Sequence, residues 1–312
     1  MAAELLDTSP VFAARLRDCS AAIGAHVDWS VEDVLRRRAG APALDRVEVV
    51  QPALFAVHVA LAELWFDSGQ QAVTVVGQSQ GEIAAACVAG ALTLADAARV
   101  IVTRSRLFAE ELAGRGGIAS IALPGGQVRA LLAGYGGALE LAGLIGPNAV
   151  TVAGECRALT DLVERLTGQN VTARIVPASI PSHCAYVEPL RDRLIAQLRG
   201  LRPQRARIPF HSTVTGGRVD GRELTADYWY ANARRPVVFA PVIRRLFTEG
   251  CDVFVECSAH PVLTAAITAI TATGRRGSSV VTGTLRRGKG GLEPFRAALA
   301  AVSAGQLHPS AA

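Results

Sequence analysis

Residues 72–90 read Ala-Val-Thr-Val-Val-Gly-Gln-Ser-Gln-Gly-Glu-Ile-Ala-Ala-Ala-Cys-Val-Ala-Gly, and this stretch decides the fold. The β-branched apolar run 72–76 predicts a buried strand of a parallel sheet. The alanine-rich segment after it predicts a helix that ends at Gly90, because glycine is favoured just past the last helical residue. Between strand and helix, two glycines flank Ser79 in the pattern G-x-S-x-G.

A serine on a sharp turn between a strand and a helix is typical of a covalent nucleophile, because the turn lifts its hydroxyl clear of the sheet. The backbone N–H of Gln80, at the start of the helix, can donate to an oxyanion and gains from the helix dipole. We therefore predict that Ser79 is the nucleophile and that Gln80 contributes to an oxyanion hole. A tight turn without chemistry is the alternative.

Strands and helices alternate along the rest of the chain. Helices are predicted at 11–24, 30–38, 53–66 (opened by Pro52), 94–113, 187–199 and 239–249, with strands near 207–213 and at 252–256. Residues 117–176 form a β-α-β-α-β piece with the size of a ferredoxin-like insertion. The predicted fold is α/β with a largely parallel sheet, and it comprises a large subdomain (1–115 and 181–312) and a small one (116–180).

A serine nucleophile needs a base, and histidine is the usual one. His183 and His260 both follow strand-like segments and lie in predicted loops, where a base could be placed. His58 falls on the apolar stripe of the predicted helix 53–66, where a histidine is more often a core residue. The residue pattern alone leaves His183 and His260 as equal candidates.

Arg104 is the second informative residue. On the predicted helix 94–113 it lies inside the apolar stripe, whereas Arg99 and Arg106 face the opposite side. A buried arginine must meet an anion, because an unpaired charge is costly to desolvate. That anion is either an internal Asp or Glu, or the carboxylate of a substrate held by the guanidinium fork.

Composition excludes several classes of protein. Half the residues are hydrophobic, as in a compact globular chain, and no uninterrupted apolar run approaches the roughly 20 residues of a membrane span. The N-terminus lacks a secretion signal, so a cytoplasmic protein is expected. The net charge of +5 is almost entirely arginine spread along the chain, which argues against nucleic acid and suits an acidic carrier protein or coenzyme A phosphates. The six cysteines have no metal-type spacing, and no metal is predicted.

Short motifs extend over nearly all 312 residues. They are Arg46–Pro52 (RVEVVQP), Gly77–Gly90, Arg104 within TRSRL, Ser182-His183, Tyr228–Tyr230 with Asn232, Arg235–Val237, Glu256–Leu263 and Leu285–Arg287. With these motifs the chain resembles the malonyl-CoA:acyl-carrier-protein transacylase superfamily, and most closely the acyltransferase domains of modular type I polyketide synthases. A generic esterase would share only the serine pentapeptide.

The resemblance implies an α/β-hydrolase-like large subdomain with an inserted ferredoxin-like small subdomain. It makes Ser79 the nucleophile and His183 the base, in preference to His260. It makes Arg104 the clamp for the free carboxylate of the acyl unit. It further implies that the main-chain carbonyl of Asn232 orients the histidine and that Gln51 lines the site.

The implied reaction is ping-pong: acyl-CoA acylates Ser79, and the phosphopantetheine thiol of an acyl carrier protein then takes the acyl group. No permanently bound cofactor is expected, and neighbouring polyketide synthase domains are expected partners. Two alternatives remain, namely a serine hydrolase that strips acyl groups from carrier proteins and a non-catalytic docking module. A hydrolase has no need of a buried carboxylate clamp, so Arg104 is the discriminating feature.

The chain departs from the family pattern in its acyl-selecting residues. Gln78 stands where the family usually has histidine, and the selectivity motif is Ile180-Pro-Ser-His183. Pro-Ser-His-Cys is similar to the malonyl transferases of fatty-acid synthesis, whereas RVEVVQ and Gln80 resemble the methylmalonyl pattern. Small Ser182 leaves room for an α-substituent, so we favour methylmalonyl or a larger branched malonyl unit.

The family also begins with a Phe-Pro-Gly-Gln-Gly strand whose glutamine region supplies a second oxyanion N–H, and here Met1 aligns just after it. Three explanations are considered: the sequence is truncated, its start is misassigned, or the strand is supplied from elsewhere. Without the strand, we expect lower stability and slower acyl transfer.

Overall fold

The computed structural model describes residues 2–177, 179–273 and 279–307, so both ends of the predicted large subdomain lie outside it. The first third of the chain is mainly helical. It contains α1 (Ala3–Thr8), α2 (Pro10–Gly24), α3 (Val31–Arg36), α4 (Val47–Asp67), β1 (Val75–Val76), α5 (Gly81–Val88) and α6 (Leu94–Glu111). The helix α6 is capped as its sequence suggests, because Thr93 Oγ1 accepts from the backbone N–H of Asp96 at 3.1 Å.

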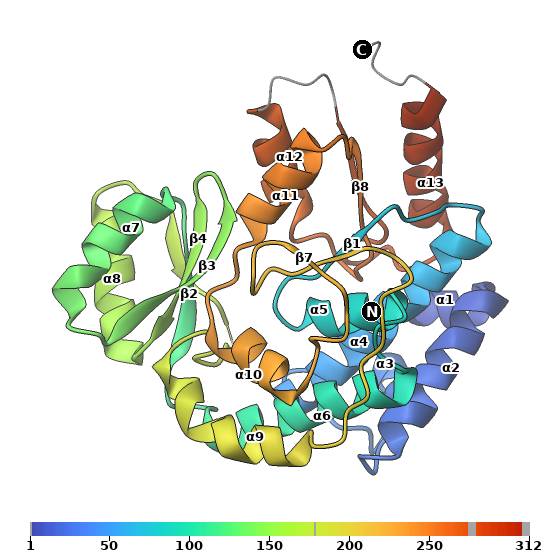
Figure 1. The fold of residues 1–312 in the computed structure, drawn as a ribbon, viewed down its shortest axis with the longest axis horizontal. Helices are drawn as coiled ribbons and strands as arrows, with labels where there is room; N and C mark the ends of the chain where they lie inside the picture. The colour runs from blue at the N-terminus through green and yellow to red at the C-terminus, as the bar shows by residue number, and fades with distance from the viewer. Residues whose placement is uncertain (1, 178, 274–278, 308–312) are drawn as a thin grey trace.

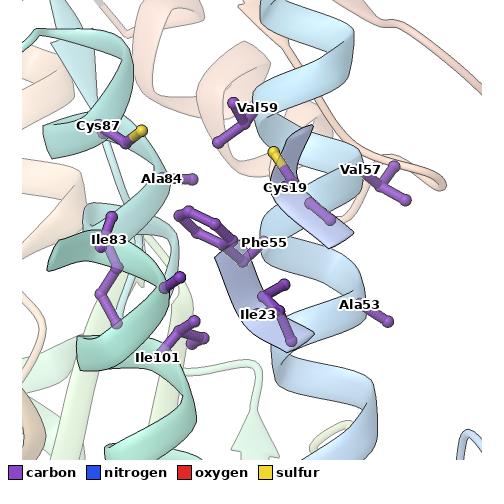
Figure 2. Close-up of a cluster of buried hydrophobic side chains, with 14 of the residues drawn as sticks. Cys19, Ile23, Ala53, Phe55, Val57, Val59, Ile83, Ala84, Cys87 and Ile101 are labelled. Carbon is purple, nitrogen blue, oxygen red and sulfur yellow. The ribbon is translucent and has the colours of Figure 1, made fainter. Parts of the chain in front are cut away.

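Helix α4 is the centre of the largest apolar core and packs against α2, α5 and α6. Figure 2 shows Phe55 reaching from α4 toward Ile83 and Ala84 of α5. The helix begins at Val47, so the predicted opening at Pro52 is wrong. Pro52 lies inside the helix and is buried, and as a proline it cannot donate a backbone hydrogen bond there.

The length and apolar composition of α4 would suffice to cross a membrane. Twelve of its residues are buried inside the protein, including Phe55, Leu61 and Trp65. The helix is therefore a core helix rather than a membrane span, and its side chains are buried on nearly every side rather than along one stripe.

The inserted piece forms a four-stranded antiparallel sheet with its own apolar core. Its elements are β2 (Gly117–Ile121), α7 (Gly125–Leu132), β3 (Leu139–Gly146), β4 (Ala149–Gly154), α8 (Cys156–Gly168) and β5 (Ala173–Ile175). The strand order β3-β4-β2-β5 is ferredoxin-like, and both helices lie on one side of the sheet (Figure 1). The sequence analysis missed β3, so the unit is β-α-β-β-α-β. Its bounds at 116–180 remain a prediction.

The small sheet is hydrogen-bonded to the rest of the chain through β3. The backbone N–H of Leu144 donates to Val237 O at 2.8 Å, and Val237 N–H donates to Ala142 O at 2.9 Å. Val237 follows the last turn of α10 (Ala226–Arg234), so this contact ties the small sheet to the helix that borders the candidate site.

The remaining elements complete the large unit. They are α9 (Arg191–Gln197), preceded by a 3-10 helix over Ala185–Leu190, then β6 (Phe210–His211), β7 (Arg218–Val219), α10, α11 (Phe239–Thr248), β8 (Val253–Glu256), α12 (Thr264–Ala272), β9 (Val280–Gly283) and α13 (Leu292–Leu307). The strands form two small sheets rather than one, because β1 pairs only with β6 and β8 pairs only with β9, both in parallel. Of the predicted strand 72–76 only Val75 and Val76 pair, and Val73 is 73% exposed.

Candidate active site

Ser79 lies on a strained turn between β1 and α5. Its φ of 54° is in the left-handed region, which non-glycine residues rarely adopt. A Cβ on Gly77 would lie 2.1 Å from the backbone nitrogen of Glu82, so only glycine allows the chain to double back this closely. The turn therefore presents the Ser79 hydroxyl at the N-terminus of α5.

His183 contacts that hydroxyl directly. The distance between Ser79 Oγ and His183 Nε2 is 2.7 Å, and His183 Nδ1 lies 2.9 Å from the carbonyl oxygen of Arg235. A carbonyl can only accept, so Nδ1 carries the proton and Nε2 presents its lone pair to the serine. His260 lies elsewhere, with Nδ1 accepting from the backbone N–H of Arg287 at 3.3 Å.

The surroundings keep His183 uncharged. Its side chain is buried, and burial together with the nearby Arg104 charge lowers its pKa to about 3. The backbone carbonyls of Arg235 and Asn232 act in the opposite direction but do not overcome burial. At neutral pH the imidazole is a free base, as a proton acceptor for a serine must be.

Arg104 is a buried cation beside the nucleophile. It is 2% exposed, its Nη1 donates to Gln51 Oε1 at 2.7 Å and its Nη2 to Ser79 Oγ at 3.3 Å. The guanidinium also lies 4.4 Å from the ring centre of Phe108. Burial lowers its pKa to about 9, which leaves it charged at pH 7.

Within the described residues no Asp or Glu pairs with Arg104, and its Nε has no hydrogen-bond partner. The internal ion pair considered from the sequence is therefore not formed there. A buried cation is unfavourable unless an anion pairs with it, so the Arg104 guanidinium is suited to bind a carboxylate.

Gln80 follows the serine directly and is the N-cap residue of α5. None of the acceptors in the described part of the chain engages its backbone N–H, which leaves that donor available at the helix N-terminus. Gln78 precedes the serine, half-buried, and its carbonyl accepts from the backbone N–H of Gly81 at 2.9 Å. Ile180 and Ser182 are buried in the segment that leads to His183.

Asn232 contacts the nucleophile turn through its side chain. Its Nδ2 donates to Ser79 O at 3.2 Å and to Glu82 Oε2 at 3.0 Å. His183 Nδ1 donates a hydrogen bond to the carbonyl of Arg235, which opens the motif Arg235–Val237 but whose role the sequence analysis did not predict. The predicted contribution of the Asn232 carbonyl to histidine orientation stays a prediction.

Glu82 is a fully buried carboxylate behind the turn, and the sequence analysis also missed it. It accepts from the backbone N–H and the hydroxyl of Thr213, from Tyr228 Oη at 2.6 Å and from Asn232 Nδ2. Burial raises its pKa and these donors oppose the rise. An acidic residue in the first turn of a helix is common because it interacts favourably with the helix dipole, so the sequence gives no signal of this role.

The geometry as a whole fits nucleophilic acyl transfer. A serine hydroxyl, a neutral histidine that is hydrogen-bonded to it, a free N–H at a helix N-terminus and a buried cation converge on one point. The described residues contain no group of three or more His, Cys, Asp or Glu side chains placed to hold a metal ion.

Comparison with known proteins agrees with this geometry. The family model described as "Acyl transferase domain" matches residues 1–309. The chain belongs to the acyl transferase domain family. The α/β fold class and the acyltransferase assignment predicted from the sequence are thereby confirmed.

The relatives are modular polyketide synthases. The chain is 49% identical over 302 residues to polyketide synthase GfsB of Streptomyces halstedii, which covers 96% of the chain but only 5% of that protein. It is similar to the acyltransferase domain from module 8 of the salinomycin polyketide synthase, with a TM-score of 0.94, 46% identity, and coverage of 97% of this chain and 71% of that one. It is also similar to a loading acyltransferase from the avermectin modular polyketide synthase. The TM-score is 0.92 and the identity 44%, and the match covers 96% of this chain and 94% of that one.

The low pKa of His183 predicts how the stability of the protein depends on pH. Between about pH 6.5 and 3, His183 is protonated in the unfolded chain but not in the folded protein. The free energy of unfolding therefore decreases as the pH falls, by at most roughly 1.4 kcal/mol per pH unit. Urea unfolding of a His183→Gln variant between pH 7 and 5 should show a shallower fall than the unchanged protein. Most unfolded glutamates, with a pKa of about 4.3, stay ionised across this window, and their contribution is common to both proteins.

His260→Gln is the matched control for the histidine-to-glutamine change itself, because His260 is exposed and lies away from Ser79. Equal slopes for His183→Gln and the unchanged protein would show that His183 is not held neutral in the folded state.

Proposed function

We propose that this chain transfers a malonyl-type acyl group from coenzyme A to the phosphopantetheine thiol of an acyl carrier protein through an acyl-enzyme at Ser79. One observation carries the proposal: the buried guanidinium of Arg104 lies 3.3 Å from the Ser79 hydroxyl and has no carboxylate partner among the described residues. A carboxylated acyl group that reacts with Ser79 would supply that partner.

In the first half-reaction Ser79 Oγ attacks the thioester carbonyl while His183 Nε2 takes the hydroxyl proton. The Gln80 N–H stabilises the oxyanion that forms. The C–S bond then breaks, and the leaving thiolate takes the proton from His183. In the second half-reaction the carrier thiol gives its proton to His183 and attacks the ester, and Ser79 leaves with that proton.

The proposed acyl group is a branched malonyl unit, methylmalonyl or larger. The Arg104 fork suits the free carboxylate that all malonyl units share, and Gln51 accepts a hydrogen bond from one arm of the fork. Small Ser182, in the buried segment before His183, leaves room for an α-substituent. Ile180 and Gln78 complete the proposed lining of the acyl site.

The carrier protein and neighbouring synthase domains are the proposed partners, since the chain spans a small fraction of each curated relative. No permanently bound cofactor is required by this mechanism, and the cytoplasm is the proposed location. A carrier-protein hydrolase is the second candidate, but water attack makes no use of the buried cation beside the serine. A docking module would not need the 2.7 Å serine–histidine contact.

Ser79 should become acylated when the protein is mixed with methylmalonyl-CoA, and peptide mass mapping should find the added mass on its peptide. His183→Ala should slow this acylation on the order of 10²-fold or more, because the general base is lost. His260→Ala is the matched control and should acylate at the unchanged rate. An adduct that persists in Ser79→Ala, or a slow His260→Ala, would refute the assignment.

Arg104→Ala should slow acylation by methylmalonyl-CoA far more than acylation by propionyl-CoA, which has the same methyl group on its α-carbon but no carboxylate. Loss of one partner of a buried charge pair costs about 2–5 kcal/mol, which corresponds to roughly 30-fold to several thousand-fold. The measurement is the single-turnover acylation rate for each ester.

Arg99→Ala provides the control on the same helix, since Arg99 donates instead to the backbone carbonyl of Gln197. Equal losses for the two esters in Arg104→Ala would mean that Arg104 has a structural role and that the carboxylate is recognised elsewhere.

A further inference from the structure

Glu140 joins the small sheet to the loop that carries His183. It lies near the start of β3, and its Oε1 accepts a hydrogen bond of 2.6 Å from the backbone N–H of Ala185. Ala185 is two residues beyond His183, so the carboxylate holds the loop directly after the candidate base.

The second oxygen of Glu140 binds Arg234. Arg234 Nη1 donates to Glu140 Oε2 at 3.0 Å, and Arg234 Nε donates to Glu188 Oε1 at 2.9 Å. The side chains of Arg234 and Glu140 are 23% and 32% exposed, so this contact is at the edge of the solvent rather than in the core. Ion pairs of that exposure add little to global stability.

Arg234 also lies between the two residues whose carbonyls hold His183. The His183 N–H donates to Ala233 O at 2.9 Å, and its Nδ1 donates to Arg235 O at 2.9 Å. The contacts form a closed ring: from His183 to Ala185, across Glu140 to Arg234, and back through the last turn of α10 to the imidazole.

We propose that Glu140 is a positioning residue for His183, and that the small sheet thereby sets the placement of the base. The φ of 62° at His183 supports this, because a left-handed non-glycine residue persists only where its surroundings hold it. The ring supplies a contact on each side of that residue. Without Glu140, the imidazole keeps its chemistry and loses its fixed distance to Ser79.

The inference rests on the proposed role of His183 as base, and the two can fail separately. If His183→Ala acylates Ser79 at the unchanged rate, the proposed function fails. If His183 is required and Glu140→Ala has no effect, only the present inference fails.

The test is the single-turnover acylation of Ser79 by methylmalonyl-CoA, measured by intact mass over a range of ester concentrations. Glu140→Ala should lower the maximal rate at least tenfold, with little change in the half-saturating concentration. Glu140→Gln should give a rate between those of the unchanged protein and Glu140→Ala, since its amide oxygen still accepts from Ala185 N–H but its NH2 group cannot accept from Arg234. Glu249→Ala, which breaks an exposed pair with Arg245, is the stability control and should leave the rate unchanged.

Two double variants distinguish a positioning role of Glu140 from a general loss of stability. Arg234→Ala combined with Glu140→Ala should be no slower than the slower single variant, because both break one ring. In a His183→Ala background, Glu140→Ala should have no further effect on the residual rate. An additional loss in that background, or a melting temperature that falls with the rate and is not restored in Glu140→Gln, would overturn the proposal.

Discussion

Two non-glycine residues with left-handed backbones, Ser79 and His183, face each other across a hydrogen bond of 2.7 Å. Each such conformation costs on the order of 1 kcal/mol or more and needs support from its neighbours. The turn at Ser79 is supported by the close packing of Gly77 and by the amide of Asn232, and His183 by carbonyls of the α10 terminus. Much of the surrounding structure can be understood as holding these two residues in contact.

A buried acidic side chain, Glu82, and a buried cation, Arg104, lie near this contact, and they differ in their hydrogen-bond partners. Glu82 accepts hydrogen bonds from three residues, so the protein itself supplies its hydrogen-bond partners. Among the described residues, the acceptors of Arg104 are the neutral oxygens of Gln51 and Ser79. A buried charge without a counter-charge is costly, and the proposed carboxylated acyl group would bring the missing anion.

The sequence predicted those features that depend on local pattern. The serine turn follows from a strand, two glycines and a helix in succession, and the buried face of Arg104 follows from helical periodicity. The strand β3 was missed because glycine, leucine and alanine dominate it and give no clear alternation. Glu82, Arg235 and Glu140 could not be predicted, since each acts through partners far away in the sequence and no spacing encodes such contacts.

The backbone hydrogen bonds between β3 and Val237 also bear on how the protein moves. A hinge that swung the small sheet outward would have to break these bonds together with the Glu140–Arg234 pair. We therefore expect the sheet and the end of α10 to move as one rigid body on the timescale of turnover, with low-amplitude motion at their junction. Under the proposed function, acyl-CoA and the pantetheine arm would then reach Ser79 through rotamer changes of side chains rather than through opening of the two halves.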